Sequence, residues 1–160
     1  MNIALLQEGV NGMSTEVKLS QSTAIRVEHA RINGMSDAAI LEAIRTQNAS
    51  GFDAVADDYY VYDEFLSYAA EHGERLEEAV KDGYRMTFNT RGGLGIWLEK
   101  AFGLKADQDF TVGEGIVTGL RLKPEQAEIL ARRLATNWIV AESVDVPAGK
   151  ELTLKLRALA

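Results

Sequence analysis

Apolar residues in the first third of the chain recur at three- and four-residue steps, the spacing of helices that bury one face. A first helix is predicted over residues 24–33, ending at Asn33-Gly34. Ser36 is a preferred N-cap residue and predicts a second helix that runs to about Asn48. Before these helices, a weak alternation over residues 17–20 indicates a strand. The chain is therefore expected to start with two packed helices joined by a short turn.

A longer stripe of the same kind runs through residues 52–69, within an acidic segment that extends to residue 82. This spacing predicts one long helix or two, with the stripe facing a core and the acidic residues of the segment lying off it. His72-Gly73 is expected to break the run, and a short helix is expected over residues 74–81 with its end at Gly83. The stripe consists of Phe52, Val55, Tyr59, Tyr62, Leu66 and Ala69.

After Gly83 the pattern changes to alternating strands and helices. Period-two alternation is typical of strands, and Thr90 and Pro124 are good residues for helix starts. The chain therefore predicts an α+β fold, with a helical N-terminal half and a small, mainly antiparallel sheet with two covering helices in the C-terminal half. The expected strands are 85–89, 116–123, 138–144 and 151–157, and the expected helices are 90–103 and 124–134.

The length of 160 residues suits one domain, which we expect over residues 13–160. A split into two subdomains near residue 83 is the alternative. Residues 1–12 are expected to be an extension of that domain. They are either a flexible tail or an upstream stretch ahead of a translation start at Met13 rather than Met1, because codons for Glu8-Gly9-Val10 can spell a ribosome-binding sequence.

Composition excludes several classes of protein. There is no cysteine, so disulfides and thiolate metal sites are excluded, and neither of the two histidines has metal-ligand spacing to the other, so no metal site is expected. No motif implies a cofactor. No apolar run approaches the ~20 residues of a membrane span, and the first residues do not resemble a secretory signal. A cytoplasmic protein with no membrane partner is the expectation, whereas its oligomeric state is left open.

Negative charge is concentrated in one segment. Residues 53–82 hold ten of the 24 acidic residues and only two basic ones, so this segment has a formal charge of −8, although the whole chain has only −7. Four of the five tyrosines also lie between positions 59 and 68. Aromatic side chains among acids suit recognition of a basic partner, because the aromatics add contact area and the acids steer the encounter.

This segment gives the preferred functional prediction: a small interaction or regulatory protein without catalytic activity, which binds a protein with a basic surface. The alternative is an ordinary solvated acidic helix face. Tyr60 is expected to be exposed, because it lies off the apolar stripe that includes Tyr59. The predicted binding residues are Asp57, Asp58, Tyr60, Asp63 and Glu64.

A glycine-rich loop, Arg91-Gly92-Gly93-Leu94-Gly95, lies between a predicted strand and a predicted helix. Backbone N–H groups at such a helix start can bind phosphate, so Arg91, Gly92, Gly93 and Gly95 are candidate phosphate-binding residues. The loop resembles the Arg/Gln-x-x-Gly-x-Gly loop with which N-acetyltransferases hold the pyrophosphate of acetyl-CoA, although Thr90 occupies the Arg/Gln position. This resemblance implies an acyl-CoA- or nucleotide-binding transferase. The alternative is that the glycines permit close packing of the helix on the sheet.

Residues 26–48 have the spacing of a helix-turn-helix, which makes a DNA-binding regulator a third hypothesis. Its second helix offers two acids, Asp37 and Glu42, and one arginine, Arg45. A DNA reader has to neutralise several phosphates and then contact base edges. A nucleic-acid partner is therefore not expected.

Overall fold

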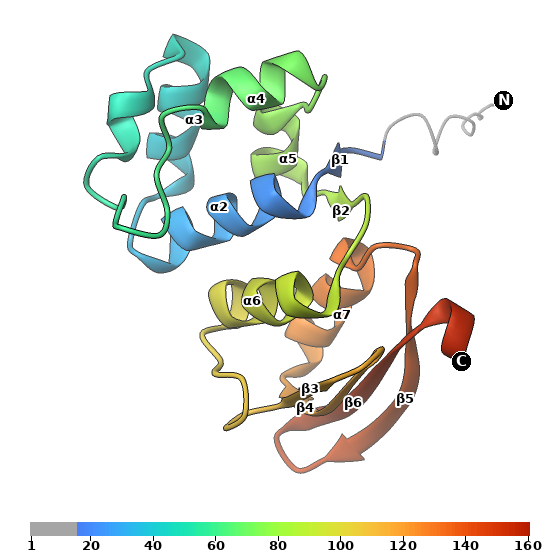
Figure 1. Cartoon of the computed structure of the whole chain (residues 1–160). Helices are drawn as coiled ribbons and strands as arrows, with labels where there is room; N and C mark the ends of the chain where they lie inside the picture. Colours follow the sequence, from blue (N-terminus) through green and yellow to red (C-terminus); the bar gives the residue numbers. More distant parts are fainter. Residues whose placement is uncertain (1–15) are drawn as a thin grey trace, which may run out of the picture.

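The computed structural model describes residues 16–160 (Figure 1). The proposed extension over residues 1–12 lies outside the described residues. Within the described residues, four helices and a short 3-10 helix form the N-terminal half, and a sheet with two helices forms the C-terminal half, which confirms the predicted fold class. The helices are α2 (Gln21–Ile32), α3 (Asp37–Thr46), α4 (Phe65–Glu71), α5 (Leu76–Asp82), α6 (Arg91–Phe102) and α7 (Pro124–Arg133), and the N-terminal 3-10 helix is η2 (Ala49–Phe52).

The larger sheet is antiparallel and has the order β3-β4-β6-β5. Its longest strands, β5 and β6, form a hairpin whose register runs from Trp138 opposite Leu156 to Val146 opposite Gly149. Helices α6 and α7 lie on one face of this sheet (Figure 1). The short strand β3 was not predicted. The strands are β3 (Thr111–Gly113), β4 (Ile116–Leu122), β5 (Trp138–Val146) and β6 (Gly149–Leu156), and the 3-10 helix η3 (Arg157–Leu159) follows.

A second, two-stranded parallel sheet joins the ends of the helical half. It pairs β1 (Lys18–Leu19) with β2 (Arg85–Met86). The strand predicted over 85–89 is therefore wrong beyond Met86. The backbone turns there because buried Asn89 binds other segments: its Oδ1 accepts from Ala135 N at 2.8 Å, and its backbone oxygen accepts from Trp138 Nε1 at 2.9 Å.

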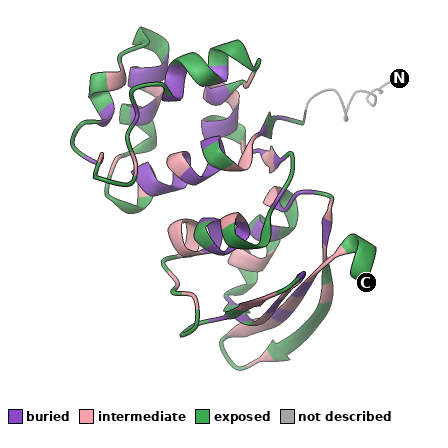
Figure 2. Ribbon diagram, viewed as in Figure 1, coloured by how far each residue is buried: buried purple, intermediate pink, exposed green. Residues whose placement is uncertain are grey.

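The core is continuous across both halves (Figure 2). Helix α2 packs against α6, so the first helix of the described residues contacts the first helix after Gly83. The spacing of apolar residues in the C-terminal half predicts seven core side chains. Six of them are buried and Phe102 is half-buried; the buried ones are Leu94, Trp97, Leu98, Leu130, Leu134 and Trp138. A single domain and a split near residue 83 both remain predictions, although this core favours one cooperative unit.

A buried polar network also crosses between the halves. The hydroxyl of Tyr84 donates to Glu28 Oε2 at 2.7 Å and accepts from Trp97 Nε1 at 2.8 Å. Glu28 in turn accepts from Arg31 Nη1 at 3.1 Å. Burial raises the pKa of Tyr84, so this hydroxyl keeps its proton. The network is satisfied, which buried polar groups require.

The helix predicted through residues 53–64 is wrong, because this segment is not helical. The Asp57 carboxylate accepts from the N–H of Tyr59 at 2.9 Å and of Tyr60 at 2.8 Å, and Asp57 N donates to Tyr60 O at 3.1 Å. Short acidic side chains that bind nearby backbone in this way compete with helix formation. As a result Tyr59, which was assigned to the core, is 86% exposed, whereas Phe52 and Tyr62 of the same stripe are buried.

Candidate partner-binding site

Residues 57–64, which we name the acidic loop, are anchored to α2 by His29. This histidine is buried, with Nδ1 at 2.8 Å from the Tyr62 hydroxyl and Nε2 at 3.1 Å from Asp57 Oδ2. The Tyr60 ring stacks on the imidazole with 4.3 Å between ring centroids. The loop is thus fixed by three of its own side chains.

His29 and the backbone of α2 both bind Tyr62. The Tyr62 hydroxyl donates to the carbonyl of Arg26 at 2.9 Å and is also hydrogen-bonded to His29 Nδ1. Burial raises the pKa of Tyr62, which keeps the hydroxyl protonated. The Asp57 carboxylate only accepts, so His29 Nε2 donates to it. Both ring nitrogens of His29 therefore hold the loop against α2.

Asp57 itself has a perturbed pKa. Desolvation disfavours its carboxylate, but the N–H groups of Tyr60 and Tyr59 and the ring of His29 outweigh this effect and lower its pKa. Because the folded value lies below the unfolded one of about 3.9, the stabilisation is present above about pH 4 and is lost as the pH falls through the folded value.

We expect the melting temperature of the Asp57→Asn variant to fall less than that of the wild type when the pH is lowered from about 5 to about 2.5. The reason is that the variant no longer has this carboxylate to protonate. Thermal unfolding followed by circular dichroism measures the effect. Asp58→Asn is the matched control, since it removes the same charge from the neighbouring position and no ion pair of the described chain includes Asp58. Equal acid dependence of the two variants contradicts the assignment.

The outer side of the acidic loop combines apolar and acidic groups. Tyr59 is 86% exposed and Val61 54% exposed. Asp58, Asp63 and Glu64 lie beside them, and none of the ion pairs formed within residues 16–160 includes any of these three carboxylates. The loop therefore presents acids whose charge the described chain does not neutralise.

A hollow of about 330 Å³ lies between this loop, α2 and α4. Arg26 is its one basic lining residue, and that guanidinium is already engaged by Val61 O at 3.1 Å and Ser22 Oγ at 3.0 Å. Apolar side chains next to carboxylates can accept the stem and the charged end of a lysine or arginine. The hollow is lined by Ser22, Thr23, Arg26, Val61, Asp63, Glu64, Phe65 and Tyr68.

The structure divides the predicted binding residues into two groups. Asp63 and Glu64 line the hollow, and Asp58 lies on the exposed side of the loop. Asp57 and Tyr60 instead hold the loop against His29, and Tyr60 is half-buried, so its expected exposure was wrong. The exposure of Tyr59 and Val61 was not predicted from the sequence. The Asp57-Asp58 pair, which favours turns, was the signal that could have indicated the loop.

The glycine-rich loop forms the first turn of α6. Gly93 N donates to Thr90 Oγ1 at 3.1 Å, and Thr90 N donates to Gln21 Oε1 at 3.1 Å, so part of this helix start is already capped. A side chain on Gly93 would collide with Gln21, and one on Gly95 would lie 3.2 Å from Val112. These contacts give the glycines a packing role, whereas Arg91 and Gly92 are exposed and phosphate binding remains a prediction.

The helix pair α2 and α3 has the short turn that the third hypothesis requires, and DNA binding remains untested. Ser36 caps α3 by accepting from Ala39 N at 3.1 Å, as predicted. His29 is buried, whereas Asn33 is exposed. The exposed residues of α3 include both Asp37 and Arg45, so this helix presents mixed charge.

Neither a metal centre nor a membrane span is found in the part of the chain that the structure describes. No group of three or more histidine or carboxylate side chains there could hold a metal ion. No helix there has the length and apolar composition to cross a membrane.

No protein-family model, curated protein or solved structure matches this chain.

Proposed function

We propose that this chain is a cytoplasmic interaction module without catalytic activity, which binds a lysine- or arginine-rich segment of another protein through the acidic loop and the adjoining hollow. One observation carries the proposal. Three carboxylates that form no ion pair within residues 16–160, those of Asp58, Asp63 and Glu64, lie beside the exposed side chains of Tyr59 and Val61.

The charge and the apolar groups have separate roles in this proposal. Residues 53–82 carry a formal −8, which attracts a basic segment and raises its rate of encounter. Tyr59 provides contact area with few rotatable bonds, so its immobilisation costs little entropy. A solvated acidic surface would need only the charge. The exposed tyrosine and valine therefore favour a binding surface over a merely solvated one.

The geometry also supports a prepared site rather than a flexible one. Asp57 and Tyr60 fix the first half of the loop against His29, and Tyr62 of the loop and Phe65 directly after it are buried. A loop that is ordered before binding loses less conformational entropy when its partner arrives. Binding is therefore expected without a large rearrangement of residues 57–64.

Selection from peptides displayed at a length of about twelve residues, which reach about 40 Å when extended, tests the proposal directly. The wild-type protein is expected to enrich peptides rich in lysine and arginine, and these peptides should protect Tyr59 and Val61 from chemical footprinting. Selection of acidic or neutral peptides, or binding that leaves the loop unprotected, contradicts the proposed function.

We expect Tyr59→Ala to weaken binding of a selected basic peptide about tenfold at every salt concentration, because an aromatic anchor acts through contact area and shape. Fluorescence polarisation measures the affinity. Phe88→Ala is the matched control, since Phe88 is also an exposed aromatic residue, at 59% exposure, but lies outside the acidic loop. Equal losses in the two variants would show that Tyr59 has no specific role.

A further inference from the structure

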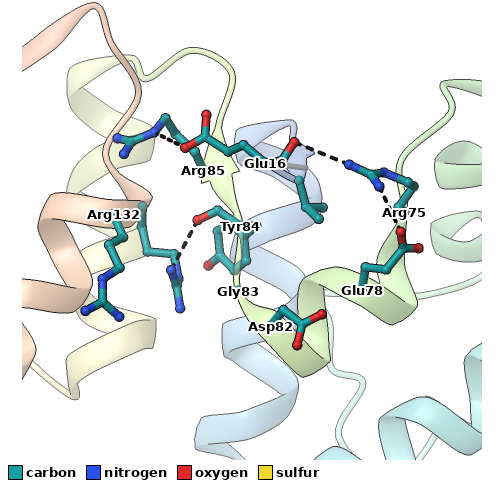
Figure 3. A pocket seen from close by; sticks show the side chains of 10 residues that line it. Glu16, Arg75, Glu78, Asp82, Gly83, Tyr84, Arg85 and Arg132 are labelled. Atoms are coloured by element: carbon teal, nitrogen blue, oxygen red, sulfur yellow. Dashed lines mark hydrogen bonds and ion pairs between the residues drawn. The ribbon is translucent and has the colours of Figure 1, made fainter. Parts of the chain in front are cut away.

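A second pocket, of about 440 Å³, opens between α5 and α7 (Figure 3). Its charged lining residues are four arginines and three acids. Small-molecule sites usually have volumes of about 300–1,000 Å³, so this pocket is large enough for a metabolite-sized ligand. We name it the arginine pocket, and it is lined by Glu16, Val17, Arg75, Glu78, Asp82, Gly83, Tyr84, Arg85, Arg132 and Arg133.

Two of the four arginines form ion pairs shorter than 3 Å with acids that also line the pocket. Arg75 Nη1 lies 2.8 Å from Glu78 Oε2, and Arg85 Nε lies 2.9 Å from Glu16 Oε2 (Figure 3). Arg85 also donates to the carbonyl of Leu134 at 2.7 Å. These two guanidinium groups have their hydrogen-bond acceptors and hold the walls of the pocket in place.

Arg133 has a different environment. No ion pair of the described residues includes it, and its guanidinium lies over the Tyr84 ring, 5.0 Å from the centroid, and donates to Tyr84 O at 3.3 Å. Burial lowers the pKa of Arg133; Tyr84 and Glu28 raise it in part, and the positive charges of Arg31 and Arg132 lower it. A bound anion would favour the charged form of this guanidinium.

The neighbouring Arg132 adds a second available charge. Its nearest carboxylate is Glu128, at 3.8 Å, and both side chains are mostly exposed. Gly83 makes room for the other arginine, Arg133, because a Cβ there would lie 2.8 Å from Arg133 Nη2. Its backbone φ of +96° also favours glycine. A side chain at position 83 would therefore compete with the Arg133 guanidinium for space.

We propose that the arginine pocket binds a phosphate dianion, either free or as the monoester of a small molecule, through Arg132 and Arg133. Guanidinium groups bind phosphate oxygens through paired N–H donors, and two such groups match the double charge of a phosphate better than the single charge of a carboxylate. Asp82, which forms no ion pair in residues 16–160, lines the α5 wall and can accept a hydrogen bond from a hydroxyl of a monoester.

Calorimetric titration of the full chain tests this site, with sodium phosphate, glycerol 3-phosphate and sodium acetate as separate probes at one ionic strength. Saturable binding of either phosphate probe, with no binding of acetate, is the expected result. Tighter binding of glycerol 3-phosphate identifies a monoester site, and tighter or equal binding of inorganic phosphate identifies a free-phosphate site. Saturation by acetate with equal affinity contradicts the proposal.

Variants distinguish ligand binding from a structural role, since arginine in the last turn of a helix also stabilises the helix end. Arg133→Gln and the exposed-site variant Arg132→Gln are each expected to weaken phosphate binding at least tenfold. Arg121→Gln is the matched control, because Arg121 is an exposed arginine that pairs with Glu151 on the sheet. If Arg132→Gln folds and binds phosphate as tightly as the wild type, the proposal is wrong.

Discussion

Replacing Trp97 with alanine is expected to lower the free energy of unfolding by about 3–5 kcal/mol. The indole is fully buried in α6, and its Nε1 donates to the Tyr84 hydroxyl at 2.8 Å. Its removal leaves a cavity and takes away one hydrogen-bond partner of the Tyr84–Glu28 network. A loss of this size is a large part of the stability of an ordinary small domain. Urea denaturation followed by circular dichroism measures it.

Ile96→Ala is the control for this change. Ile96 precedes Trp97 in the same helix but is 37% exposed, so its truncation should cost much less, within about 1 kcal/mol. One unfolding transition is expected for the wild type, because α2 packs on α6 and Tyr84 binds Glu28. Two transitions, of which Trp97→Ala shifts only one, would instead support separate units on either side of residue 83.

Local signals were sufficient where a segment could form its structure from its own residues. Ser36 and Thr90 each accept a hydrogen bond from the backbone N–H three positions later, as N-cap residues do, and Pro124 begins α7. The alternation of Leu152 and Leu154 with polar residues likewise marked β6. In these segments the preferred local conformation and the tertiary structure agree.

The prediction failed where a contact across the chain determined the structure. The extent of the strand predicted over 85–89 is the first case. Strands β1 and β2 have two residues each and pair with one another 67 positions apart in register, so β2 ends at Met86. The acidic loop is the second case. Tyr59 has helical spacing from Val55, but Asp57 binds the following backbone and the carbonyl of Arg26 holds Tyr62. Periodicity alone contains neither of these interactions.

The candidate site could also be predicted only where it depends on residues that are close in the sequence. Charge density identified Asp58, Asp63 and Glu64, because an excess of acids is visible in the sequence itself. His29 and Asp57 are 28 positions apart, so the anchor of the loop depends on tertiary packing. The arginine pocket was missed because Arg132 and Arg133 also have a sufficient local explanation, as cations in the last turn of a helix.

The Asp58→Asn, Asp63→Asn, Glu64→Gln triple variant is expected to bind a selected basic peptide about 10- to 100-fold more weakly than the wild type at about 20 mM salt, and only a few-fold more weakly at about 500 mM. The reason is that salt already screens the attraction in the wild type at the higher concentration. Fluorescence polarisation across this range measures the dependence. Asp57 is left unchanged because it holds the loop against His29.

The matched control for this charge prediction is the Asp107→Asn, Glu114→Gln, Glu125→Gln triple variant, which removes the same number of charges from exposed positions in the C-terminal half. Asn suits position 107, where the backbone φ is +68°. The control should retain nearly wild-type affinity, because its acids lie outside the acidic segment 53–82. If both triple variants lose the same affinity, the attraction comes from the net charge of the chain. If neither loses any, the carboxylates of the acidic loop are only a solvated surface.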